Sequence, residues 1–233
     1  QALRQLDVVP MCEPTRLTPV RTKLGLLMRK IFMGLLAPLM LVAGLVAPNG
    51  AGAITVPGDE RIADTTDPVL ASVQLSQHFI PGKGVVESVI LGRADVFADN
   101  LGGSALAGAR EGVMLLTDGG SRASLRSEVR DEIDRVLTPS PANLACNAQT
   151  ANVYILGGTA AVSQSVEDTL VDDGWCVGRL GGASRFETAV LIGGVVRQVT
   201  NDFDFSMVAR SDNPVDSAAA GAFASRNGIP IAL

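Results

Sequence analysis

Short apolar runs separated by helical patterns constrain this chain more than any other feature of its sequence. In chain order, the runs cover residues 88–91, 113–116, 153–156 and 175–180. Strands that are apolar along their whole length are buried on both faces, which is typical of parallel sheets. The stretches before and between the runs carry helical periodicity or small residues, and they cover residues 69–79, 99–110, 125–137 and 163–170. We therefore predict an α/β fold in which helices flank a mostly parallel sheet.

The pattern starts again at Arg179. A helix that ends near Val199 is followed by a strand at 206–209, a helix at 218–226 and a strand at 229–233. The segment Arg93-Ala-Asp95 aligns with Arg210-Ser-Asp212 at an offset of 117 residues. Self-similarity on this scale indicates duplication of a domain. We predict tandem similar domains, with a first repeat at 68–178 whose start is degenerate and a second repeat at 179–233 that is truncated.

The stretch 28–53 has the three parts of a signal peptide. Arg29 and Lys30 form a short positive region, residues 31–47 carry no charge, and Ala51-Gly52-Ala53 matches a cleavage site. A transmembrane anchor is the alternative, but it needs about 20 apolar residues and this run is shorter. We predict a non-native or disordered extension at 1–27, a signal peptide at 28–53 and a linker at 54–67.

The charge of the chain argues against nucleic acid as a partner. The full chain has a net charge of −5 and a pI of about 4.9, whereas nucleic-acid binding needs a basic face. Loss of residues 1–53 removes six of the 19 basic and two of the 24 acidic side chains, which leaves a net charge of −9. The exported part is therefore more acidic than the whole.

Two cysteines, Cys146 and Cys176, remain after residues 1–53 are removed. In an exported chain two cysteines most often pair, because that compartment does not keep thiols reduced. Cys146 precedes one predicted strand and Cys176 lies in another, so a disulfide is feasible, and two buried free thiols are the alternative. The sequence has no CxxC motif and a single histidine, His78. We predict neither a metal site nor a cofactor.

Glycines and aspartates near predicted strand ends raise the question of catalysis. Gly157-Gly158 resembles a phosphate-binding turn, but no GxGxxG motif is present, and close helix–strand packing is the favoured interpretation. Asp95 and Asp99 could form a carboxylate pair for acid–base chemistry. For Asp99, and for Asp216 in the second repeat, capping of the next helix is favoured. We predict a binding protein, with a secreted enzyme as an alternative.

Four segments of the chain match a known set of motifs. They are Gly92-Arg-Ala-Asp95, Val113-Met-Leu-Leu-Thr117, Val153–Ser163 and Arg179–Ala189. These segments resemble the cell-wall-binding repeat 2 family of Gram-positive surface proteins, over about residues 61–233. The last two, VYILGGTAAVS and RLGGASRFETA, are the most specific. The first repeat lacks the family's Arg-Tyr/Phe-Glu-Thr opening at Arg61, and the second has Pro214-Val215 in place of Phe-Pro.

The resemblance implies a secreted, S-layer-like protein of the cell surface. Its tandem repeats would bind an anionic secondary cell-wall polymer, or a glycan linked to peptidoglycan, without a covalent bond. Contact with the membrane would occur only during export. The alternative is that these repeats anchor a secreted cell-wall hydrolase or peptidase whose catalytic domain lies beyond residue 233.

Arginine suits such a ligand, because its guanidinium group makes bidentate contacts with phosphate and carboxylate groups. The candidate ligand-binding residues lie at strand ends and helix starts: Arg93, Asp95, Arg179, Arg185, Glu187, Arg210 and Asp212. For Arg185 and Glu187, salt bridges between adjacent repeats are an equal alternative. A net charge of −9 repels an anionic polymer at long range. Attachment therefore needs a local arginine cluster, bridging divalent cations or basic regions elsewhere.

Overall fold

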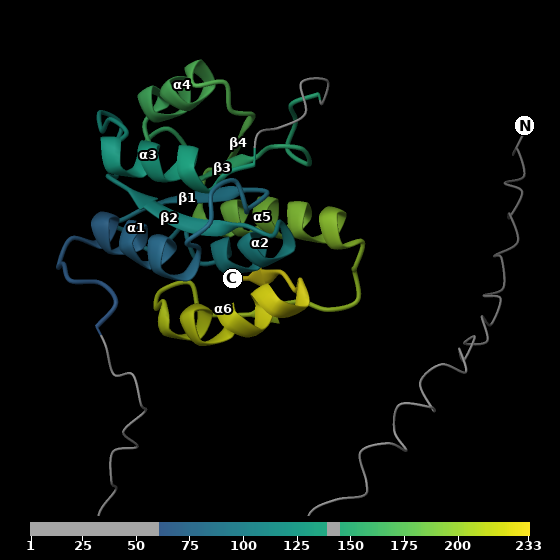
Figure 1. Ribbon diagram of the computed structural model, residues 1–233. Helices are drawn as coiled ribbons and strands as arrows, with labels where there is room; N and C mark the ends of the chain where they lie inside the picture. The colour runs from purple at the N-terminus through teal and green to yellow at the C-terminus, as the bar shows by residue number, and fades with distance from the viewer. Residues whose placement is uncertain (1–60, 139–144) are drawn as a thin grey trace, which may run out of the picture. The chain divides into compact units, whose positions relative to one another are not determined.

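A computed structural model describes residues 61–138 and 145–233 of the chain (Figure 1). The predicted extension and signal peptide, and residues 54–60 of the predicted linker, lie outside these residues. The helices are α1 (Pro68–Phe79), α2 (Gly103–Ala109), α3 (Ser127–Val136), α4 (Gln164–Asp172), α5 (Arg185–Thr200) and α6 (Val215–Asn227). The strands are β1 (Val89–Arg93), β2 (Val113–Thr117), β3 (Val153–Leu156), β4 (Val177–Leu180), β5 (Met207–Val208) and β6 (Ile231–Ala232).

Four strands form a parallel sheet in the order β2-β1-β3-β4. Leu91 of β1 lies opposite Leu115 of β2 on one side and Ile155 of β3 on the other. Every residue of β3 is buried, because helices cover both faces of this central strand. The predicted α/β fold with a parallel sheet between helices is confirmed.

Alternate residues of the strands point into two cores, one on each face of the sheet. On one face, Leu91 and Ile155 pack with Ile133 of α3 and with residues of α1 and α4. On the other face, Leu106 of α2 and Ile192 of α5 belong to one core with strand residues such as Ile90 and Tyr154. Figure 1 shows α3 and α4 on the opposite side of the sheet from α2 and α5. The sheet is therefore the middle layer of three.

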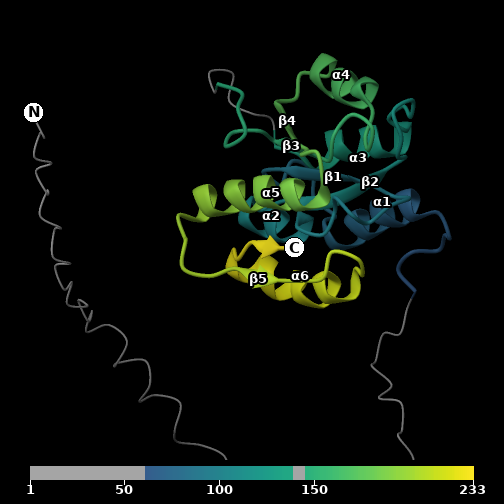
Figure 2. The same cartoon turned by 180° about the vertical axis from the view of Figure 1, so that it is seen from behind.

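A second, smaller sheet consists of β5 and β6, which are parallel and pair Met207 with Ile231. The helix between them, α6, lies along α2 in both views (Figures 1 and 2). A β-carbon at Gly221 would lie 2.8 Å from Ser104 Oγ, so the two helices approach closely there. The order helix, strand, helix, strand therefore occurs twice, from α1 to β2 and from α5 to β6.

The segment before α2 differs from the prediction. The helix was expected to begin at Asp99, but it begins at Gly103, and Gly102 is its N-cap without a side-chain hydrogen bond. The preceding residues form turns, because the Asn100 N–H donates to the Phe97 carbonyl and the Asn100 carbonyl accepts from the Gly103 N–H. The Asn100 amide also donates to the Arg93 carbonyl at 2.7 Å. The interpretation of Asp99 as a helix cap is therefore wrong.

The N-caps of α4 and α6 differ in kind. Ser163 caps α4, and its Oγ accepts from the Val166 N–H. For α6, the N-cap is Pro214, so the interpretation of Asp216 as a cap is wrong. Asp216 lies in the first turn instead, where a carboxylate is favoured by the helix dipole.

Within the two described ranges, none of the helices combines the length and the apolar character that a membrane crossing requires.

Candidate ligand-binding surface

The carboxyl end of β1 carries the first Arg-x-Asp pair, at the edge of the sheet where α/β proteins hold ligands. Arg93 donates to both carboxylate oxygens of Asp95, from Nε to Oδ1 at 2.7 Å and from Nη2 to Oδ2 at 2.6 Å. The Arg93 side chain is 18% exposed and that of Asp95 52%. The hydrogen bonds from Arg93 lower the pKa of the Asp95 carboxyl, so the pair is ionised at neutral pH.

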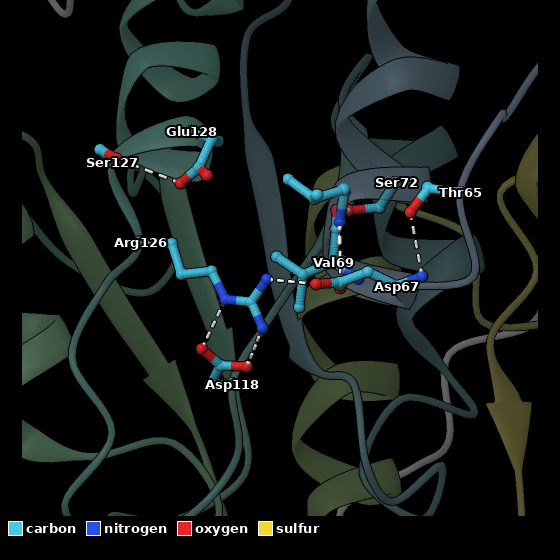
Figure 3. A network of polar contacts seen from close by, with 9 residues as sticks. Thr65, Asp67, Val69, Ser72, Asp118, Arg126, Ser127 and Glu128 are labelled. Atoms are coloured by element: carbon cyan, nitrogen blue, oxygen red, sulfur yellow. Dashed lines mark hydrogen bonds and ion pairs between the residues drawn. The ribbon is translucent and has the colours of Figure 1, made fainter.

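A second cluster surrounds Arg126, the residue that precedes α3 (Figure 3). Its guanidinium donates to both oxygens of Asp118, at 2.6 and 2.7 Å, and to Oδ2 of Asp67 at 2.5 Å. Asp67 is also the N-cap of α1 and accepts from the backbone N–H groups of Val69 and Leu70. The hydrogen bond from Arg126 lowers the pKa of Asp67, and the bonds to Asp118 and Asp67 raise that of Arg126. This cluster ties the start of α1 to the start of α3.

The two clusters border one groove of about 360 Å³. Asp67, Asp95, Asp118 and Arg126 are among the residues that line it. Gly119 lies against the first pair, because a β-carbon there would be 2.0 Å from Asp95 Oδ1. Three carboxylates outnumber two guanidinium groups at this edge. All three guanidinium nitrogens of Arg126 already donate to carboxylates, so its charge is largely neutralised and attracts an anion only weakly.

The second Arg-x-Asp pair follows β5 and is far more open. Arg210 donates to Asp212 from Nε at 3.0 Å and from Nη2 at 2.7 Å. The two side chains are 63% and 68% exposed. Arg185 donates to the Ser211 carbonyl at 2.5 Å, and its guanidinium lies 5.9 Å from the centre of the Phe97 ring. Arg210, and to a smaller extent Arg185, lowers the pKa of Asp212. Two arginines therefore stand beside one aspartate here.

Arg179 is bonded to the scaffold around it. It donates to Glu167 Oε2 at 2.7 Å and to the backbone carbonyls of Gly157, Val162 and Ser163. Its side chain is only 16% exposed. Arg179 therefore fixes the loop between β3 and α4.

Glu187 belongs to the start of α5. Its Oε2 accepts from the Ala183 N–H at 2.9 Å, while the Ser184 Oγ accepts from the Glu187 N–H. This reciprocal arrangement closely resembles a capping box and stabilises the first turn of the helix. Of the seven predicted residues, the structure groups Arg93 with Asp95, and Arg185 with Arg210 and Asp212. Arg179 and Glu187 each lie in a local scaffold.

The Gly157-Gly158 turn is explained by the close approach of chain segments. Gly157 has a φ of +96°, a backbone conformation that residues other than glycine rarely adopt. A β-carbon there would lie 2.8 Å from Asp99 Oδ2, and one at Gly181 would lie 2.4 Å from the Gly157 carbonyl carbon. Asp95 is bound by Arg93 and Asp99 lies against Gly157. The two aspartates thus have different partners.

Cys146 and Cys176 form a disulfide in the structure, across a sequence separation of 30 residues. Residue 176 immediately precedes β4, so the bridge joins the loop before β3 to the edge of the sheet. In the part of the chain that the structure describes, His, Cys, Asp and Glu side chains nowhere gather in threes that could hold a metal ion.

Three residues of this surface were not predicted from the sequence: Asp67, Asp118 and Arg126. For Asp67 a signal was present, because an aspartate directly before a proline is typical of a helix start. Asp118 follows a predicted strand, as Asp95 nearly does. For Arg126 there was no local signal, since its partner Asp67 lies 59 residues away.

Comparisons with known proteins agree with this architecture. Residues 61–167 match the family model of cell wall binding domain 2. The solved structure of Cwp8 from Clostridium difficile is 26% identical, with a TM-score of 0.60, and its match covers 75% of this chain. That of Cwp6 from Clostridium difficile is 19% identical, with a TM-score of 0.59 over 79% of this chain, and this likeness concerns the fold alone. The chain spans 28% of the length of each. No curated protein matches it in sequence.

Proposed function

We propose that this chain, whose residues 61–167 belong to the cell wall binding domain 2 family, is an exported surface protein that its repeats hold on the cell wall. The family match carries this proposal. It spans the segment from before α1 into α4, and it includes the Arg93–Asp95 pair and the Val153–Ser163 motif. The fold shared with Cwp8 agrees with it. Attachment of this kind is binding without catalysis.

The ligand we propose is an anionic secondary cell-wall polymer, or a glycan linked to peptidoglycan. A polymer with phosphate or carboxylate groups suits arginine, which contacts such groups through two parallel hydrogen bonds. The open pair at Arg210 supports this choice, because 63% of that side chain is exposed and Arg185 stands beside the same aspartate. The edge at Arg93 carries more aspartates than arginines. We therefore assign the contact to Arg185 and Arg210, and a supporting role to Arg93, Arg179 and Glu187.

Sedimentation of the protein with purified cell walls tests this proposal. We expect the double variant Arg185→Gln/Arg210→Gln to bind walls at least about tenfold more weakly than the wild-type protein, because it loses two charge-assisted contacts. Chemical removal of the anionic polymers from the walls should lower binding of the wild-type protein to the same level. Arg130→Gln is the matched control, since Arg130 is 49% exposed and paired with Asp173 on another part of the surface.

Two results would contradict the proposal. Binding that is indifferent to removal of the polymers would exclude them as the ligand. An equal loss in Arg130→Gln and in the double variant would indicate a general effect of charge, without a site at Arg185 and Arg210.

A further inference from the structure

The loops that follow β2 and β3 hold each other in place. The Gly120 N–H donates to the Ala161 carbonyl at 2.8 Å. A second bond runs from the Ser163 hydroxyl to the Ala123 carbonyl. Both loops lie within residues 61–167, so each finds its partner inside the same repeat. The geometry of this pair of loops therefore does not depend on any other repeat.

Each loop contains a β-turn. The first turn, residues 120–123, is closed by a bond of 3.2 Å from the N–H of its last residue to the carbonyl of its first. The second turn, residues 158–161, is closed in the same way by a bond of 2.8 Å. The two central residues of each turn are exposed: Ser121, Arg122, Thr159 and Ala160. Two fixed turns thus present their tips to the solvent.

Three of these four side chains carry polar groups that bond to no other residue of the described ranges: Ser121, Arg122 and Thr159. Three other arginines near the carboxyl ends of the strands are each bound to a carboxylate: Arg93, Arg126 and Arg179. Arg122 differs from them, because its guanidinium is engaged by no carboxylate of the described residues. Its positive charge therefore remains available to a ligand, together with one hydroxyl on each turn.

Open space adjoins the two tips. A β-carbon at Gly158 or at Gly120 would meet no heavy atom within 4 Å. Gly158 does not have the positive φ of Gly157, so its backbone accommodates other residues as well. A ligand can therefore reach the backbone at the start of both turns.

We propose that the two turns form a second contact for the anionic wall polymer, in which Arg122 binds a phosphate or carboxylate group. The Ser121 and Thr159 hydroxyls, which both donate and accept hydrogen bonds, bind hydroxyls of the adjoining sugar. Guanidinium groups make strong, charge-assisted bonds to such anions. The proposal rests on the proposed function and adds to the contact at Arg185 and Arg210.

Binding of the full chain to purified cell walls, before and after removal of their anionic polymers, tests this contact. We expect Arg122→Gln to bind untreated walls about tenfold more weakly than the wild-type protein, because one charge-assisted contact is lost. Lys83→Gln is the matched control and should bind as the wild type does. It removes the same charge from an exposed side chain in the turn before β1, which bonds to no other described residue.

A second variant tests the open space without changing any charge. Gly158→Gln places a side chain where no protein atom lies, so we expect an unchanged melting temperature but binding about tenfold weaker or more, since the ligand is excluded. Equal melting temperatures would also establish that Arg122→Gln is folded.

The outcomes separate this contact from the proposed function. Wild-type binding that is indifferent to removal of the polymers would overturn both. Binding that depends on the polymers, with Arg122→Gln and Gly158→Gln both as tight as the wild type, would overturn this contact and leave the proposed function standing. Equal losses in Arg122→Gln and Lys83→Gln would overturn it as well, because they indicate a general effect of charge.

Discussion

Each of the two sheets has an Arg-x-Asp sequence at the carboxyl end of one strand, β1 in the larger sheet and β5 in the smaller, but the two sequences are buried to different extents. In the four-stranded sheet, β3 is buried along its whole length. In the two-stranded sheet, Val208 of β5 is 83% exposed. Arg93 is accordingly 18% exposed in its pair and Arg210 63%. The same motif is therefore largely enclosed after a strand with two neighbours and open after a strand with one.

Replacement of one apolar strand residue by alanine in each sheet is the strongest test of this comparison. Ile155 is fully buried in β3, and Ile155→Ala should lower the free energy of unfolding by about 2–5 kcal/mol through lost contacts and a cavity. Val208→Ala should change it by less than about 0.5 kcal/mol, because the side chain is already in water. Urea unfolding of both variants checks this. Equal losses would mean that the two sheets are buried alike.

The disulfide provides the next contrast, since it lies beside the four-stranded sheet. Replacement of Cys146 and Cys176 by serine reopens a loop closed over a separation of 30 residues, which should cost about 3 kcal/mol. Hydrogen exchange of the oxidised protein and the variant would locate the loss. We expect faster exchange in β3 and β4, with β5 and β6 unchanged. Faster exchange in β5 and β6 to the same degree would show that both sheets open as one unit.

The parts of the fold that could be predicted are those with a local cause. The strand at Val153–Leu156 was predicted with the bounds it has, because burial on both faces demands a continuous apolar run. The start of α2 was wrong by four residues, since the turns before it depend on a bond from the Asn100 amide to the Arg93 carbonyl. The second sheet was expected to be longer than it is, because apolar runs do not report how many neighbours a strand has.

The site follows the same rule. Arg93 and Asp95, like Arg210 and Asp212, are two residues apart, so each ion pair is a local contact that the sequence indicates. The exposure of each pair is not, because it depends on distant segments such as Gly119. The role of Arg179 was also beyond prediction, since three of its four partners are backbone carbonyls, and these have no sequence signature.

The smallest expected effect is a difference in how the Arg126–Asp67 pair and the Arg210–Asp212 pair make the stability of the fold depend on pH. The hydrogen bond from Arg126 holds the pKa of Asp67 below its ordinary value of 3.8. A carboxylate of this kind stabilises the fold above that ordinary value, and the contribution is lost as pH falls through the lower, folded value. In Arg126→Met the pKa of Asp67 returns toward 3.8. The variant should therefore have a slightly lower melting temperature at neutral pH, and its melting temperature should fall less on acidification.

Arg210→Met should change the dependence of melting temperature on pH less, because the Arg210–Asp212 pair is 63% and 68% exposed and water screens it. Thermal unfolding measured from about pH 6 to about pH 2 would resolve shifts of roughly a few °C. A steeper decline in Arg126→Met than in the wild type would contradict the assignment of Asp67 as its partner, and equal slopes in both variants would remove the distinction between the two ends.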